Sequence, residues 1–390
     1  MTTETIEDLS VSRPTSIGRR RGNESNSPSV RRAVLIFGVL VCGAYAGVID
    51  SQKGRLDADG ATVWYDGQVL PIEGRAFGDT ESYYDRLPAR AKMTVPDPLW
   101  SLSHDSAGMA LHFVSDAETF KIRWAVRGTS LAMPHMPATG MSGVDVYRRA
   151  SDGWRFVKNG RPTGVTNEVS VSLEPNSECL VYLPLYNGTA MVEVGIPKDR
   201  TIGTKPARPS ARTKPVVIYG TSITQGGCAS RPGMAFTAIA GRIADAPVVN
   251  LGFSGNGKME LALCDLLAEI DASAYVLDCL WNMGDALVQE RVEPFLRALQ
   301  QKRPATPILL AEDCNAFEQA PTAKSRIVRG IYDKLKAQDA AQWKNLHYLE
   351  AKEMLGHDGE GTVDGCHPND LGMMRQGIVF GEAIRRILTP

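Results

Sequence analysis

The sequence predicts two folded parts in series, an antiparallel β-sandwich followed by an α/β domain built on a parallel sheet. The chain has 390 residues, which exceeds the size of one ordinary domain. Short apolar runs, several of alternating polarity, fill its first half and are typical of antiparallel strands. In the second half continuous apolar runs alternate with amphipathic stretches, which indicates a parallel sheet covered on both faces by helices.

The composition is that of a globular protein. Lys plus Arg number 43 and Asp plus Glu 44, so the formal net charge is −1, and a basic nucleic-acid-binding surface over the whole chain is excluded. Hydrophobic residues make up 43% and charged residues 22%, which excludes a mostly disordered chain and a polytopic membrane protein. Seven cysteines are too few and too scattered for a disulfide-built miniprotein.

The first 46 residues differ from the rest of the chain. Residues 1–32 are rich in Ser, Thr, Arg and Asn and nearly lack large apolar side chains, so we expect a disordered tail. Arg31 and Arg32 then precede an uncharged apolar run, Ala33 to Ile49, in the order of an export signal. Because Ala44-Tyr45-Ala46 fits a cleavage site, we predict a signal peptide within residues 1–46 and an exported protein, periplasmic, cell-surface or extracellular.

Other interpretations of the apolar run stay open. Its length is at the lower limit for spanning a bilayer, so an uncleaved membrane anchor through residues 33–49 is the main rival. Arg31-Arg32 also partly resembles a twin-arginine signal, and Leu40-Val41-Cys42 weakly resembles a lipoprotein box. A buried strand or helix is the remaining alternative.

Residues 55–205 are predicted to form the β-sandwich. Lys121-Ile122-Arg123-Trp124 shows the period of two of a half-buried strand. Asp152-Gly153 and Asn187-Gly188 are hairpin-type turns between such runs. The expected strands are ATVWY, MALHFV, TFKIRWAV, GVDVYRRA, GWRFV, ECLVYLPL and AMVEVGI.

Residues 198–214 are predicted to be a solvated linker between the two parts. They are basic, contain proline and have no large apolar side chain after Ile202. A polybasic patch for a membrane or nucleic acid is less favoured, because the segment lacks aromatic residues.

Residues 213–390 are predicted to form the α/β domain. The expected strands are 216–219, 248–251, 274–280, 308–311 and 346–349. The expected helices are 260–270, 289–301, 324–337 and 370–388, with a further helical stretch from Gly233. Since open α/β sheets carry their chemistry beyond the carboxyl ends of the strands, polar residues at those ends are the candidate site.

A serine and a histidine stand at such positions. Ser222 directly follows the first parallel strand, where a strand-to-helix turn presents its hydroxyl at the top of the sheet. Asp364 and His367 precede the last helix. Their spacing lets the carboxylate hold the imidazole Nδ1 proton while Nε2 faces the serine. This set predicts nucleophilic catalysis by Ser222, with activity falling as the pH drops through the range in which histidines ordinarily take up a proton.

Two further strand ends supply candidate donors for an oxyanion. The glycine-rich loop Asn250-Leu251-Gly252-Phe253-Ser254-Gly255-Asn256-Gly257 leaves the second parallel strand with accessible N–H groups. Asn282 follows the third strand and offers a neutral amide donor. Each piece alone is a weak signal, but all four, in this order and each at a strand end, are a strong one.

From these motifs, residues 214–388 resemble an SGNH (GDSL-like) hydrolase. The resemblance implies a flavodoxin-like three-layer α/β/α fold. Upstream, Gly143-Val144-Asp145-Val146-Tyr147 and Trp154-Arg155-Phe156 resemble the GxDLY-type β-domain that precedes a subgroup of these enzymes. Thr221, Leu280 and Met283 depart from the commonest family pattern, but match this subgroup.

The resemblance also implies a role for each residue. Ser222 would be the nucleophile, His367 the general base and Asp364 its orienting partner. The oxyanion hole would consist of the Ser222 N–H, Gly255 and Asn282. Taken singly, each residue has another interpretation: a helix N-cap for Ser222 or Asn282, a surface histidine for His367, and a turn glycine for Gly255.

No cofactor or metal is expected. The other histidines, His104, His112, His135, His347 and His357, show no metal-ligand spacing, and no Cys-x-x-Cys pair occurs. Asp278 and Glu312 are acids at strand ends whose role, structural or substrate-contacting, stays open. Cys228 and Cys366 flank the serine and histidine loops, so we hypothesise a disulfide across the mouth of the site, with buried free thiols as the favoured alternative.

The sequence therefore predicts an exported serine esterase that acts on a carboxylic ester, with O-acyl or O-acetyl groups on a carbohydrate as the expected substrate. A lipid or other small-molecule esterase is the close rival, although Thr224, Gln225 and Arg231 near the serine do not suggest a broad apolar groove. An alternative from another class is a non-catalytic carbohydrate-binding or adhesion protein that retains a hydrolase fold. No nucleic-acid partner is expected.

Overall fold

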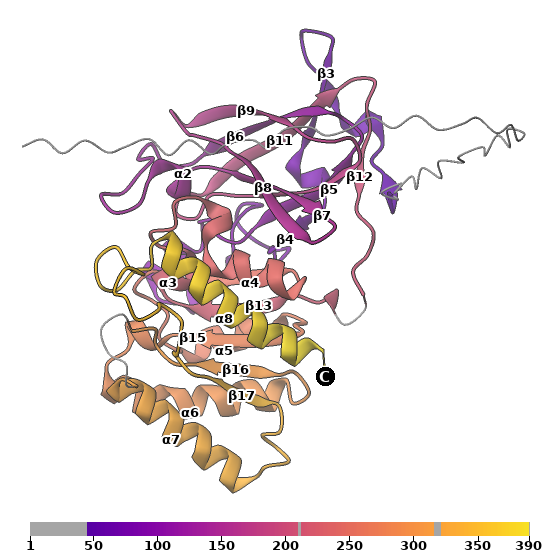
Figure 1. Cartoon of the computed structure of the whole chain (residues 1–390). Helices are drawn as coiled ribbons and strands as arrows, with labels where there is room; N and C mark the ends of the chain where they lie inside the picture. Colours follow the sequence, from indigo (N-terminus) through magenta and orange to yellow (C-terminus); the bar gives the residue numbers. More distant parts are fainter. Residues whose placement is uncertain (1–44, 210–211, 316–320, 390) are drawn as a thin grey trace, which may run out of the picture. The chain divides into compact units, whose positions relative to one another are not determined.

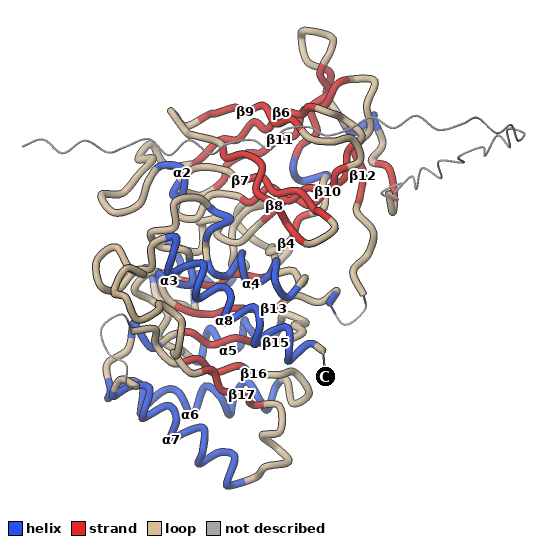
Figure 2. The backbone as a smooth tube through the Cα atoms, in the orientation of Figure 1, coloured by secondary structure: helices blue, strands red, loops and turns tan. Residues whose placement is uncertain are grey.

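The structure is a computed structural model that describes residues 45–209, 212–315 and 321–389 (Figures 1 and 2). Two antiparallel sheets form the first half of this part of the chain. The strands are β1 (Gly47–Val48), β2 (Arg55–Leu56), β3 (Thr62–Asp66), β4 (Ile72–Glu73), β5 (Ala110–Ser115), β6 (Thr119–Val126), β7 (Asp145–Ala150), β8 (Gly153–Asn159), β9 (Thr166–Ser172), β10 (Ser177–Tyr182), β11 (Thr189–Pro197) and β12 (Ile202–Thr204). One sheet has the order β1-β12-β5-β10-β7-β8, with β4 paired to β5, and the other has the order β2-β3-β11-β6-β9. Every described pairing within them is antiparallel.

The two sheets pack face to face because their strands alternate in polarity. In β6, Phe120, Ile122 and Trp124 are buried while the residues between them are partly exposed. They join one apolar cluster with residues of the other sheet, including Phe113 and Val181. The predicted β-rich first half is thereby confirmed, and we call residues 47–204 the β-sandwich.

A parallel sheet forms the centre of the second half. Its strands are β13 (Val216–Gly220), β14 (Val248–Gly252), β15 (Ala274–Asp278), β16 (Ile308–Ala311) and β17 (Leu346–Leu349). They lie in the order β14-β13-β15-β16-β17 and all pair in parallel. In chain order this is 2-1-3-4-5, the flavodoxin-like arrangement, and it confirms the expected α/β fold.

Helices cover both faces of this sheet (Figure 1). Val216 and Ile218 of β13 pack with α4 (Phe236–Ala244) and α8 (Asp370–Leu388), whereas Val217 and Tyr219 pack with α5 (Leu261–Glu269), α6 (Asp285–Lys302) and α7 (Ala323–Gln338). All residues of β13, β14, β15 and β16 are buried, which is why these four strands are mostly apolar and lack the alternation seen in β6. We call residues 213–389 the α/β part.

The predicted linker, residues 198–214, is not a free connection. Ile202–Thr204 form β12, which pairs with both β1 and β5. The Arg208 side chain is only 11% exposed and binds Glu73 of β4. The prediction failed because its basic residues find carboxylates in the folded chain, which composition alone does not show.

The β-sandwich and the α/β part share a core. Leu87 and Trp100, from the segment between β4 and β5 that contains α1 (Asp97–Leu102), are buried against Leu251 and Phe253. All described residues belong to one compact unit. The division into domains 55–205 and 213–390 therefore stays a prediction, and the predicted tail and signal or anchor lie almost wholly outside the described residues.

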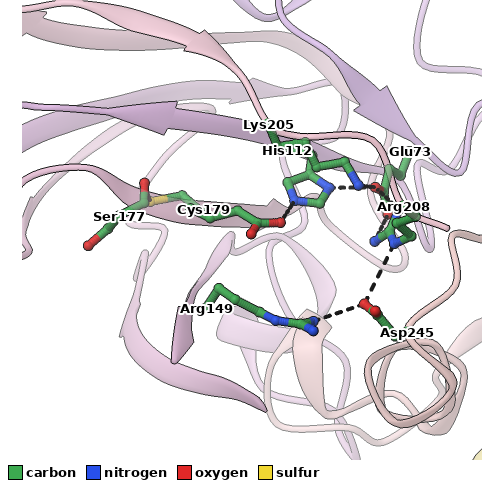
Figure 3. A network of polar contacts seen from close by, with 9 residues as sticks. Glu73, His112, Arg149, Ser177, Cys179, Lys205, Arg208 and Asp245 are labelled. Atoms are coloured by element: carbon green, nitrogen blue, oxygen red, sulfur yellow. Dashed lines mark hydrogen bonds and ion pairs between the residues drawn. The ribbon is translucent and has the colours of Figure 1, made fainter. Parts of the chain in front are cut away.

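A partly buried network of charged side chains ties three segments together (Figure 3). His112 of β5 is wholly buried and faces carboxylates at both ring nitrogens, Glu73 at Nδ1 and Glu178 at Nε2, the latter at 2.7 Å. Arg208 lies 2.5 Å from Glu73 and 3.7 Å from Asp245, the residue after α4. The network thus connects the β-sandwich, the segment after β12 and the α/β part. Further cations of the network in the described residues are Lys205, which pairs with Glu73, and Arg149 and Arg212, which pair with Asp245.

Among the helices of the described residues, none combines the length and the apolar character that crossing a membrane requires.

Candidate active site

Ser222 lies in the tight turn between β13 and the short helix α3 (Ser222–Gln225). The preceding residue, Thr221, is the N-cap, since its hydroxyl oxygen accepts a hydrogen bond from the Ile223 N–H at 3.3 Å. Ser222 is therefore the first helical residue and not the cap. Its hydroxyl is left for other partners, and its N–H is among those a helix cannot satisfy internally.

The structure brings Ser222, His367 and Asp364 into one hydrogen-bonded chain. The Ser222 Oγ lies 2.9 Å from His367 Nε2, and His367 Nδ1 lies 2.8 Å from Asp364 Oδ2. Ser222 is 7% exposed, while the His367 side chain is 23% exposed. A hydroxyl next to an imidazole that is itself oriented by a carboxylate is the arrangement required for nucleophilic catalysis.

The loop before α8 fixes the histidine. Asp364 Oδ1 accepts hydrogen bonds from the backbone N–H groups of Cys366 and His367, and the Val363 N–H donates to the His367 carbonyl. Burial acts to raise the pKa of Asp364, but these N–H groups and the imidazole outweigh it and lower the pKa to about 2. The carboxylate is therefore ionised at neutral pH and stabilises a charged imidazolium beside it.

The two predicted oxyanion donors lie on loops after β14 and β15. Asn282 Oδ1 accepts a hydrogen bond from the Gly257 N–H at 3.1 Å, which orients the amide so that Nδ2 remains as a donor. Gly255 has φ +70°, a value that favours glycine, and an added Cβ would meet nothing within 4 Å. Within the described chain the Gly255 N–H makes no hydrogen bond, so it is available to a ligand.

The β-sandwich side of the molecule supports this loop. Gln225 accepts a hydrogen bond from the Ser254 N–H at 3.1 Å and donates to Asp105 at 2.9 Å. Arg86, a fully buried guanidinium, donates to the carbonyl oxygen of Gly252 at 2.6 Å. In addition the Tyr186 hydroxyl donates to the carbonyl oxygen of Ser222 at 2.9 Å. Residues far upstream thus hold the backbone on which the candidate site is built.

These supporting residues were missed by the sequence analysis. Arg86, Asp105 and Tyr186 stand in no motif, and the residues of the α/β part that they bind lie more than 30 positions away, so no local pattern could have found them. Gln225 stands three positions after Ser222, but the sequence predicts only that it lies near the serine. Its burial instead places it beneath the site.

The other loop residues also differ from the expectation. Thr224 is fully buried, and its hydroxyl donates to Asp278 at 2.8 Å. Arg231 binds Asp145 of the β-sandwich at 2.6 Å. These side chains are therefore engaged within the fold and give no indication for or against an apolar groove at the site.

Asp278 and Glu312 have structural partners. Burial raises the pKa of Asp278 to about 7, against the bond from Thr224 that acts to lower it. Glu312 accepts hydrogen bonds from the Tyr348 hydroxyl and the Ala351 N–H, both at 2.8 Å. The two carboxyl groups thus fasten α3 and the loop after β17.

Cys228 and Cys366 are free thiols in the structure, so the hypothesised disulfide between them is not formed. Burial raises the pKa of both thiols, that of Cys228 to about 12. No group of three or more His, Cys, Asp or Glu side chains within the described residues could hold a metal ion.

Comparisons with known proteins agree with this geometry. Residues 213–385 match the model of the GDSL-like lipase/acylhydrolase family, and residues 62–202 match the model for the N-terminus of SGNH-hydrolase-type esterases. A GDSL-like lipase from Bacteroides ovatus is 34% identical, with a TM-score of 0.74, over 84% of this chain and 98% of that one. The chain belongs to the GDSL-like lipase/acylhydrolase family. It is accordingly a carboxylic ester hydrolase.

More distant solved structures share the fold of this GDSL-like hydrolase. A salicylyl-acyltransferase from a tetracycline biosynthetic pathway is 19% identical, with a TM-score of 0.64, over 81% of this chain and 93% of that one. A family two carbohydrate esterase from Cellvibrio japonicus is 11% identical, with a TM-score of 0.52, over 84% of this chain and 98% of that one. A search of curated proteins found no match.

Proposed function

We propose that this GDSL-like hydrolase is an exported serine esterase that removes O-acyl groups, O-acetyl groups above all, from a carbohydrate. The observation that carries the proposal is the hydrogen-bonded chain from Ser222 through His367 to Asp364. The carbohydrate assignment is supported by the fold shared with a carbohydrate esterase, and the export by the apolar run that ends at Ile49.

In the proposed acylation step, the Ser222 Oγ attacks the carbonyl carbon of the ester while His367 Nε2 takes its proton. The carbonyl oxygen becomes an oxyanion, which accepts hydrogen bonds from the Ser222 N–H, the Gly255 N–H and Asn282 Nδ2. Asp364 remains ionised and stabilises the imidazolium. His367 then returns the proton to the alcohol oxygen, and the C–O bond breaks to leave an acyl-serine.

Deacylation repeats these roles with water. His367 removes a proton from water, the resulting hydroxide attacks the acyl carbon, and the same donors hold the second oxyanion. The proton returns to Ser222 as the carboxylic acid leaves. Each step uses only groups of this chain, the ester and water.

The test measures hydrolysis of 4-nitrophenyl acetate and of a methyl glucoside with one acetyl group. We expect Ser222→Ala to lower kcat on both by about 10³-fold or more, because the nucleophile is removed. Ser101→Ala, which changes an exposed serine on α1, should leave kcat within about twofold. Equal rates for Ser222→Ala and the unchanged protein would refute the serine mechanism.

The same assay separates the rival functions. A strong preference for 4-nitrophenyl decanoate over the acetate, without action on the acetylated sugar, would indicate a lipid esterase. Sugar binding without turnover of any ester would indicate a non-catalytic carbohydrate-binding protein. Fractionation of cells that express the whole chain tests export, and recovery in the cytoplasm would contradict it.

A further inference from the structure

A turn of the β-sandwich reaches the candidate site. Met133, Pro134, His135 and Met136 form a four-residue turn closed by two backbone hydrogen bonds, each between Met133 and Met136, at 2.9 and 3.1 Å. At its tip the imidazole of His135 contacts the imidazole of His367, with ring centroids 5.9 Å apart and planes inclined by 58°. A side chain from 232 positions upstream therefore stands beside the proposed general base.

The turn is held firmly against the α/β part. Met136 is 2% exposed and packs in the same apolar cluster as α4 and α8. Thr139 Oγ1 donates to the Ser230 carbonyl oxygen at 2.6 Å. A Cβ on Gly140 would lie 2.1 Å from the Ala229 carbonyl oxygen, so the two backbones touch at this point. His135 is thus carried on a fixed support.

The ring nitrogens of His135 have no polar partner among the described residues. The side chain is exposed, and within the described residues it makes no hydrogen bond or ion pair. A neutral imidazole carries one N–H donor and one nitrogen acceptor, a combination that a hydroxyl group can satisfy in either direction. A polar ring fixed at the site and left without polar partners is placed to meet substrate.

The chemistry decides which part of the substrate lies there. His367 must return its proton to the alcohol oxygen, so this oxygen comes within about 3 Å of His367 Nε2. The carbonyl oxygen points instead toward Gly255 and Asn282, which lie on the loops after β14 and β15. A group beside the His367 ring therefore adjoins the alcohol part of the ester and not the acyl part.

We propose that His135 is a specificity-determining residue that hydrogen-bonds a hydroxyl group of the alcohol part of the ester, next to the bond that is cleaved. This inference rests on the proposed function and specifies its substrate further. The preferred alcohol is polyhydroxylated and carries a free hydroxyl near its acylated oxygen. The β-sandwich then contributes directly to substrate choice.

The experiment compares two leaving groups in the full-length protein. A methyl glucoside with one acetyl group offers free hydroxyls beside the ester, whereas 4-nitrophenyl acetate offers none. We expect His135→Ala to lower kcat/KM about tenfold on the acetylated glucoside, the value of one lost hydrogen bond, and to leave 4-nitrophenyl acetate within about twofold. His135→Gln, which keeps a donor and an acceptor, should recover part of the loss.

His357→Ala is the matched control, since His357 is the other exposed histidine of the described residues and pairs with Glu353. It should leave kcat/KM on both substrates unchanged. Equal losses on both substrates for His135→Ala would overturn the inference, because His135 would then act through His367 or the fold. The absence of a loss on either substrate would overturn it as well. The unchanged protein tests the proposed function separately: failure to release acetate from the glucoside would refute the carbohydrate assignment itself.

Discussion

At the scale of single residues, Asp364 shows how a partly exposed carboxylate can still serve a histidine. Its side chain is 41% exposed, yet it accepts two backbone N–H bonds and the imidazole bond together. All three contacts come from Cys366 and His367 in the same short loop, so the geometry is largely set by the local sequence. Exposure to water weakens the electrostatic effect of the carboxylate, in contrast to a fully buried one.

Asp364→Asn tests this balance. The amide cannot stabilise an imidazolium and favours the wrong tautomer of His367, so we expect kcat to fall about 10²- to 10³-fold with KM within about twofold. Steady-state kinetics on 4-nitrophenyl acetate measures both parameters. Asp358→Asn, which changes another exposed aspartate of the chain that pairs with Arg375, is the control. A loss no larger than that of the control would show that Asp364 does not orient the base.

At the scale of elements, Arg86 shows how a segment before β5 positions a loop after β14. Its guanidinium donates to the carbonyl oxygens of Gly252, Leu102 and Asp105 and lies over the Phe253 ring, 4.7 Å from the centroid. Burial lowers its pKa to about 10, so it is still charged at neutral pH. The planar fork of arginine can bind several carbonyl groups at once, which lysine cannot do.

Arg86→Met should therefore both destabilise the protein and slow catalysis. We expect a loss of about 3 kcal/mol in the free energy of unfolding, because several buried carbonyl groups lose a charged donor, together with a lower kcat. Urea denaturation measures the first effect and 4-nitrophenyl acetate hydrolysis the second. Arg123→Met removes an arginine whose pairs with Glu168 and Glu193 are partly exposed, and it should cost less than about 1 kcal/mol. Equal costs for the two variants would contradict the role of Arg86.

At the scale of the whole molecule, the network around Glu73 joins the β-sandwich to the α/β part (Figure 3). Burial acts to raise the pKa values of Glu73 and Glu178, but His112 and the nearby cations outweigh it and lower both below the ordinary value of 4.5. The folded protein therefore binds fewer protons at these carboxylates than the unfolded chain. Their contribution to stability is complete above the ordinary glutamate range and is lost as the pH falls through the lowered values.

Glu73→Gln should reveal this dependence. At about pH 7 we expect a loss of about 3 kcal/mol in the free energy of unfolding, because Arg208 and Lys205 lose the counter-charge that Glu73 supplies. The difference from the unchanged protein should shrink as the pH is lowered below about 4.5, where Glu73 of the unfolded chain takes up a proton while Glu73 of the folded protein stays ionised. Asp152→Asn, on an exposed pair with Arg155, should cost less than about 1 kcal/mol. A difference that stays constant down to about pH 3 would contradict the linkage.

Much of the fold was predictable because burial leaves a periodic record in the sequence. The five parallel strands and β6 were predicted from apolar runs, and the last helix was placed at residues 370–388, where α8 lies. β9 was missed, since only Asn167 and Val171 of its seven residues are buried. β12 was missed because it has three residues inside a basic segment. Such short or edge strands are defined by their partners more than by their own composition.

The sequence by itself determined the fold class and the candidate residues at the strand ends, because strand alternation, helix periodicity and motif spacing are local properties. The tertiary structure alone decided that Ser222 and His367 meet, 145 positions apart at 2.9 Å. It alone also brought Arg86 and His135 to the site and placed the Gln225 side chain beneath it. The physical reason is that hydrogen bonds and ion pairs depend on distance in space, and contacts between distant segments leave no pattern along the chain.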